Sequence, residues 1–259
     1  MNRRIALLLA IVSLASASCA PRLVALPSGA GTPFPDYAAA YDQATDACRN
    51  VRSIAAVLAI SGRAAGQRFR AKLDGGFEAP ARVRLELPAP GRSIFVYVAS
   101  ADRATLVFPR DGRVLRDAPP AETLEALAGV SLSPDDLRTI VTGCGFGGQP
   151  VRGRTFDSGW AAVDVDGSTS WLEQVGGAWR LVAATAKGID VRYSDFVDGR
   201  SSTIRLRTTT QTAPTDLTIR LSQIDVNQPL DAGVFDADVP AGATPMTLQE
   251  LREAGPLGK

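Results

Sequence analysis

Strict alternation of apolar and polar residues over short segments is the feature that most constrains this fold. In Ala81–Leu87, valine and leucines alternate with arginines and a glutamate. Residues 67–73, 204–207 and 217–221 repeat the pattern, with charged or threonine residues between the apolar positions. A period of two is typical of β-strands that bury one face. The chain is therefore expected to form an antiparallel sheet with one apolar and one polar face.

Turn dipeptides separate these segments and set the expected number of strands. Asp111-Gly112, Asp166-Gly167, Gly176-Gly177 and Asp198-Gly199 fit tight turns between consecutive strands. They predict about eleven antiparallel strands in meander order. The candidate strands cover residues 57–62, 67–73, 81–87, 93–100, 104–108, 114–116, 160–165, 169–174, 178–184, 188–196, 201–209 and 216–224.

Helical patterns flank and interrupt the strands. Ser133 is expected to cap a helix at 134–142, with Pro134 at its first position, acids in its first turn and Gly143 at its end. Other helices are expected at 36–50, with Asp36 as the N-cap, at 121–128 and at 247–253.

The first 35 residues are expected to direct export and to link the fold to a membrane. Residues 1–18 combine two arginines, an apolar run and small residues, which are the three parts of a secretory signal. Cys19 follows and resembles the lipobox cysteine that bacteria acylate, with plain secretion after cleavage before Ser18 as the alternative. Residues 19–35, rich in Pro, Gly and Ala, are expected to be a tether, and 36–259 a single domain.

Three cysteines leave one even pair once Cys19 is assigned to the lipid. An exported chain matures in an oxidising compartment, where paired cysteines form disulfides. Cys48 and Cys144 are therefore expected to be joined, and two buried free thiols are the alternative.

Histidine is absent from the whole sequence. Its absence excludes His-based triads and most catalytic zinc sites, and no Gly-x-Ser-x-Gly sequence provides a nucleophile elbow. The adjacent acids Asp135 and Asp136 are explained by helix capping.

The chain has 28 Lys and Arg against 27 Asp and Glu, so its net charge gives no case for nucleic acid. We expect a protein that is not an enzyme and holds no cofactor or metal.

The order of elements and three segments resemble the lipoprotein-localisation family, LolA and LolB and their relatives. The segments are the strand block Leu85–Pro109, the helical region Ala121–Gly143, and a closing stretch that runs from Asp225 through Val239-Pro240-Ala241-Gly242. The resemblance covers roughly residues 37–243. It implies an α+β fold, in which short helices plug the open side of an incomplete antiparallel β-barrel.

The resemblance also implies an apolar cavity between sheet and helices that takes acyl chains of lipoproteins or lipids. A fully packed core is the alternative. In this interpretation the protein is an outer-membrane lipoprotein on the periplasmic face, because Ala20 rather than Asp follows the lipid cysteine. It would handle lipidated cargo, with a periplasmic carrier protein as a candidate partner. A structural or sensory lipoprotein is the alternative function. The cavity is expected to be lined by Leu85, Leu87, Val96, Val98, Leu106, Phe108, Leu137, Ile140, Val141, Ile204, Leu206, Ile219 and Leu221.

Overall fold

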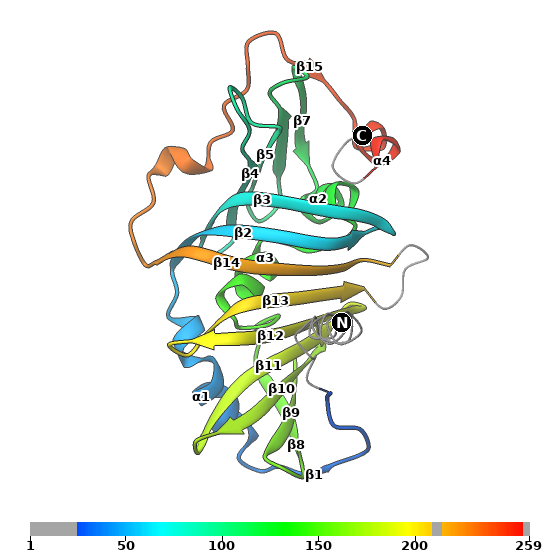
Figure 1. Ribbon diagram of the computed structural model, residues 1–259. Helices are drawn as coiled ribbons and strands as arrows, with labels where there is room; N and C mark the ends of the chain where they lie inside the picture. The colour runs from blue at the N-terminus through cyan, green and yellow to red at the C-terminus, as the bar shows by residue number, and fades with distance from the viewer. Residues whose placement is uncertain (1–24, 209–213, 256–259) are drawn as a thin grey trace, which may run out of the picture.

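One open sheet dominates the computed structural model, which describes residues 25–208 and 214–255 (Figure 1). Its fifteen strands lie in the order β1 (Thr32–Pro33), β8 (Pro150–Phe156), β9 (Trp160–Val165), β10 (Ser168–Val175), β11 (Ala178–Ala186), β12 (Ile189–Val197), β13 (Arg200–Thr208), β14 (Asp216–Val226), β2 (Ser53–Ala64), β3 (Gln67–Glu78), β4 (Arg82–Leu87), β5 (Phe95–Ala99), β6 (Ala104–Phe108), β7 (Arg113–Ala118) and β15 (Thr244–Pro245).

The α+β class is confirmed, and the expected count of about eleven strands is too low. Strands β1, β8 and β15 lie in segments where no strand was expected. All neighbours are antiparallel except β15, which runs parallel to β7. The sheet does not close. Its edge strands β1 and β15 have two residues each, and each contains a proline.

Two meanders make up the sheet, and the β14–β2 pair joins them. Strands β8 to β14 pair in chain order, as do β2 to β7. Leu217 lies opposite Gly62 and Leu221 opposite Leu58, so strands far apart in sequence form the centre of the sheet. The alternating residues therefore give the central strands one apolar inner face and one polar outer face.

Among the described residues, four α-helices accompany the sheet: α1 (Tyr37–Arg49), α2 (Pro120–Ala128), α3 (Pro134–Thr142) and α4 (Leu248–Ala254). Helix α1 packs against β8, β9 and β11, α2 against β6, and α3 against β4. None of the helices within 25–208 and 214–255 is long and apolar enough to cross a membrane.

Local sequence explains where α3 begins and ends. The Ser133 hydroxyl accepts from the amide of Asp136, and the Asp136 carboxylate accepts from the amide of Ser133. This reciprocal capping box confirms the expected start of the helix. Gly143 ends it with φ at 93°, a conformation that favours glycine. Asp36 is the N-cap residue of α1, as expected, but its side chain makes no capping hydrogen bond.

The expected disulfide between Cys48 and Cys144 is present, with the two Cα atoms 5.6 Å apart. Cys48 lies in the last turn of α1, and Cys144 lies two residues after the end of α3. Both side chains are buried. The bridge therefore ties the C-terminal end of α3 to a helix that packs on the other half of the sheet.

The segment after β14 returns along the outer face of the sheet (Figure 1). Its short 3-10 helix η1 (Ala232–Phe235) lies on β4. The Arg84 guanidinium donates to the carbonyls of Val234 at 3.1 Å and Asp236 at 3.2 Å. Arg82 lies over the ring of Phe235. The chain then forms β15 and α4, and α4 packs against α2.

Candidate functional site

An apolar cavity lies between the inner face of the sheet and helices α2 and α3. Strands β2, β3, β4, β5, β13 and β14 supply one wall, and the two helices with their connecting loop supply the other. The cavity has a volume of about 70 Å³. All its lining residues are apolar: Leu58, Ile60, Phe69, Leu73, Phe77, Leu85, Phe95, Leu124, Leu127, Ala128, Val130, Leu132, Leu137, Ile140, Val141, Leu206, Leu217 and Ile219.

Helical spacing explains the wall of the cavity that α2 and α3 form, which we call the lid. In α3, Leu137, Ile140 and Val141 stand three and four positions apart, so they share one face of the helix. Helix α2 presents Leu124 and Leu127 in the same way. Both helices therefore turn an apolar stripe toward the sheet, and they enclose a space without polar groups.

The present volume decides what the cavity can hold. A cavity on the order of 150 Å³ holds one benzene molecule, and this one has about half of that volume. An acyl chain is much larger than benzene. The cavity as it stands is therefore too small for an acyl chain, and a chain would fit only if the walls of the cavity moved apart.

Tyrosine hydroxyls hold both helices against the sheet. Tyr97, on β5, donates to the carbonyl of Pro120 in the first turn of α2 at 3.2 Å. Tyr193, on β12, donates to the carbonyl of Ile140 in α3 and accepts from the amide of Gly145, both at 3.1 Å. Burial raises the pKa of both tyrosines above the ordinary value. Both hydroxyls therefore stay protonated at neutral pH and keep donating.

The other end of α2 is held by Thr215, which precedes β14. Its hydroxyl donates to the carbonyl of Gly129 at 3.0 Å and accepts from the amide of Ala65 at 2.9 Å. An ion pair of 2.9 Å between Lys187 and Asp136 joins the start of α3 to the turn before β12. The lid helices are thus attached at both ends by polar contacts, around a cavity that is apolar inside.

Six of the expected lining residues do line the cavity: Leu85, Leu137, Ile140, Val141, Leu206 and Ile219. Five others share the apolar core but lie outside the cavity wall: Leu87, Leu106, Phe108, Ile204 and Leu221.

Val96 and Val98 were assigned to the wrong face. Val96 pairs with Glu86 and Val98 with Arg84, so both valines share the outer face with these charged residues. The inward positions of β5 belong to Phe95 and Tyr97. The outer valines are nevertheless buried, and the returning C-terminal segment lies over the neighbouring strand β4 on that face.

Two further expectations concern the N-terminus and metals. Cys19, the expected lipidation site, lies outside the described residues. In residues 25–208 and 214–255, no cluster of three or more His, Cys, Asp or Glu side chains could hold a metal ion.

Comparison with known proteins bears on the fold. No family model and no curated protein matches the chain. A solved structure of a LolA superfamily protein from Nitrosomonas europaea aligns with a TM-score of 0.54 over 77% of this chain and 97% of that chain, at 13% identity. The chain has a LolA/LolB-like fold. A putative outer membrane lipoprotein-sorting protein domain from Vibrio parahaemolyticus aligns at a TM-score of 0.49 over 76% of this chain and 96% of that one, at 11% identity.

The LolA/LolB-like fold confirms the resemblance expected from the sequence. At these identities the likeness concerns the fold alone. What the site does must therefore be argued from the cavity and its lid.

Proposed function

We propose that this protein is a non-enzymatic lipoprotein of the bacterial envelope, which binds acyl chains between its sheet and helices α2 and α3. In this proposal Cys19 anchors it to the periplasmic face of the outer membrane, and it takes part in lipoprotein or lipid trafficking. The observation that carries the proposal is a wholly apolar cavity, lined by two short amphipathic helices over the sheet of a LolA/LolB-like fold.

Burial of methylene groups would drive binding. Each methylene moved from water into an apolar site contributes about 0.8 kcal/mol, so roughly ten of them contribute about 8 kcal/mol. Moving α2 and α3 breaks their polar ties to the sheet and opposes binding. Cargo would then pass between partners according to relative affinity, with a periplasmic carrier protein as the donor.

A charge inside the cavity tests the proposal. Leu137 is only partly buried and faces the cavity from α3, so Leu137→Glu can keep the fold while placing a carboxylate among apolar groups. We expect fluorescent fatty-acid binding to weaken by at least about tenfold, because an unpaired charge in an apolar site is costly. Thermal melting of the same variant reports whether the fold is retained.

Val197→Glu is the matched control, because Val197 is 63% exposed on β12 and lies outside the cavity. It should bind fatty acid and melt like the wild type. If Leu137→Glu unfolds, Ala128→Phe fills the cavity without adding charge and should also weaken binding. A wild-type protein that binds no acyl chain, or equal loss of binding in Val197→Glu, would contradict the proposal.

The lipid anchor has its own test. Cys19→Ser should release the protein from the membrane fraction into the soluble periplasm, and mass spectrometry of the wild type should find an acylated N-terminal cysteine. A mature wild-type chain that begins at Ser18 and carries no lipid would rule the anchor out.

The small volume of the cavity favours a second candidate, a structural or sensory lipoprotein with a packed core. Such a protein would use the fold without transferring a ligand. Mass spectrometry of lipid extracted from the purified protein separates the two functions, because only a carrier or receptor should retain stoichiometric acyl chains.

A further inference from the structure

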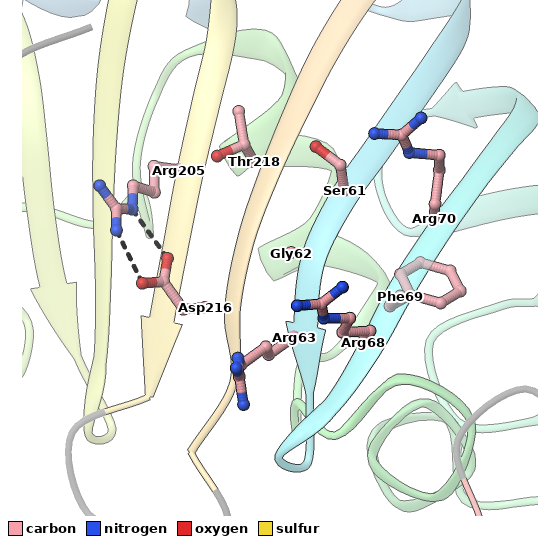
Figure 2. Close-up of a pocket in the computed structure, with 9 residues that line it drawn as sticks. All are labelled: Ser61, Gly62, Arg63, Arg68, Phe69, Arg70, Arg205, Asp216 and Thr218. Carbon is pink, nitrogen blue, oxygen red and sulfur yellow. Dashed lines mark hydrogen bonds and ion pairs between the residues drawn. The ribbon is translucent and has the colours of Figure 1, made fainter. Parts of the chain in front are cut away.

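An open groove crosses the outer face of the sheet, on the side opposite the apolar cavity (Figure 2). It has a volume of about 710 Å³ and spans strands β13, β14, β2 and β3. Its lining residues are Ser61, Gly62, Arg63, Arg68, Phe69, Arg70, Arg205, Asp216 and Thr218. Arginine is thus the commonest residue in the groove.

Strand register sets these arginines in rows. In the row near the β2–β3 turn, Arg207 lies opposite Asp216, Asp216 opposite Arg63, and Arg63 opposite Arg68. The same-face residue two positions along each strand belongs to the next row. Arg63, Arg68 and Arg70 of the β2–β3 hairpin and Arg205 of β13 therefore lie on the same face of the sheet.

The adjacent row has hydroxyls at its centre. Arg205 lies opposite Thr218, Thr218 opposite Ser61, and Ser61 opposite Arg70. In Figure 2 the two hydroxyl side chains lie between Arg205 on one side and Arg70 on the other. Within the described residues neither hydroxyl has a hydrogen-bond partner, so both can bind a ligand. The centre of the groove therefore carries two free hydroxyl groups, and an arginine lies on each side of them.

The positive charge in the groove is only partly balanced. Asp216 is occupied by Arg205, which donates two bonds of 2.7 Å to its carboxylate, and the hydrogen bond from Arg205 lowers the pKa of Asp216. Arg63, Arg68 and Arg70 form no ion pair within the described residues. Since the whole chain has a formal charge of only +1, this excess is local.

We propose that this groove binds the anionic phosphate headgroups of membrane lipids and so docks the outer face of the sheet on a membrane surface. Guanidinium groups bind phosphate through paired, charge-assisted hydrogen bonds, and hydroxyls add further donors. The cores of protein interfaces are depleted in charge and rich in aromatic residues. Here Phe69 is the one aromatic residue that lines the groove, so the groove suits a polyanionic surface better than a protein partner.

The arginines and hydroxyls of the groove lie on the face opposite the cavity, and Phe69 is the one residue that lines both. Docking through the arginines therefore does not depend on the acyl cavity. It would add an electrostatic contact to the proposed lipid anchor.

The test measures vesicle binding by the mature chain, residues 19–259, carrying Cys19→Ser, which lacks both the signal and the proposed anchor. Vesicles of phosphatidylcholine with phosphatidylglycerol should bind it, and vesicles of phosphatidylcholine alone should not. The combined change of Arg63, Arg68 and Arg70 to Gln should weaken binding roughly 100-fold, because each basic residue near an anionic surface contributes about fivefold. About 1 M salt, where the Debye length falls to ~3 Å, should abolish binding.

The matched control removes the same charge elsewhere, by changing Arg92, Arg103 and Arg116 to Gln on exposed positions of the β4–β7 region. It should bind vesicles nearly as well as the parent. Equal loss in both triple variants would mean diffuse attraction and would overturn the groove.

The parent chain provides the remaining outcomes. Failure of the parent to bind anionic vesicles would overturn membrane docking. Membrane docking would also be overturned if the parent bound soluble glycerol phosphate or an acidic protein but did not bind vesicles. Both triple variants should bind fatty acid equally well. Failure of the acyl-chain proposal can therefore be distinguished from failure of the membrane-docking proposal.

Discussion

Removal of the Cys48–Cys144 disulfide should destabilise the protein strongly and loosen the lid of the cavity. The bridge spans 96 residues in sequence. In the chain-entropy account, closing a loop of about 100 residues lowers the entropy of the unfolded chain by an amount that stabilises the fold by about 4.7 kcal/mol. For a domain of 150–250 residues, about 1 kcal/mol shifts the melting temperature by roughly 2–4 °C. The Cys48→Ala, Cys144→Ala protein should therefore melt about 10–20 °C lower.

The assay is thermal unfolding followed by circular dichroism, in the wild type and the double variant, each with and without reductant. Reductant should lower the melting temperature of the wild type alone. Hydrogen exchange gives a second readout, because amides of α3 should lose protection before those of the central strands. A fall of less than about 3 °C would refute the reasoning, since it would mean that the bridge restrains little in the unfolded chain. Unchanged exchange in α3 would refute the role in the lid.

Other changes test single contacts. Tyr193→Phe should cost about 1–3 kcal/mol in unfolding free energy, because it removes the donor to Ile140 and leaves buried groups unpaired; chemical denaturation measures this. Ser133→Ala should cost about 1 kcal/mol through loss of the capping box, and should raise hydrogen exchange at the start of α3. The pKa of Asp216 is lowered below its ordinary 3.8 by Arg205, so the pair stabilises the fold above that pH. The stability difference between wild type and Asp216→Asn should shrink as the pH falls below about 4.

Period-two alternation was a reliable guide wherever one face of a strand meets water. In β4, β13 and β14 the polar positions are outward and the apolar positions inward, as their patterns predict. Leu206 and Ile219 reach the cavity for this reason. The lid side was also predictable, because α3 carries its own start and stop signals around a clear apolar stripe.

The pattern failed where both faces are covered. Strand β5 is buried throughout, so its sequence does not distinguish the face of Phe95 and Tyr97 from that of Val96 and Val98. The pairing of Tyr97 with Leu85 decides which residues of β5 face inward. The burial of Val96 and Val98 depends on a segment more than 130 positions later, which lies over the outer face.

The hydroxyl ties of the lid were not visible in the sequence either. Tyr97, Tyr193 and Thr215 donate to backbone carbonyls, which every residue possesses. No residue type or spacing therefore marks the partner. The groove on the outer face is not predicted either. Arg63, Arg68 and Arg70 belong to one expected hairpin, but only the β14–β2 pairing brings Arg205, Asp216 and Thr218 beside them.

The two edge strands have a consequence for aggregation. An open sheet exposes unpaired amides and carbonyls at both margins, which can recruit strands from other chains and start aggregates. Here both margins end in a two-residue strand with a proline, Pro33 in β1 and Pro245 in β15. Proline has no amide hydrogen to offer to a further strand. The fold can therefore leave its sheet open while denying neighbouring chains a template for growth.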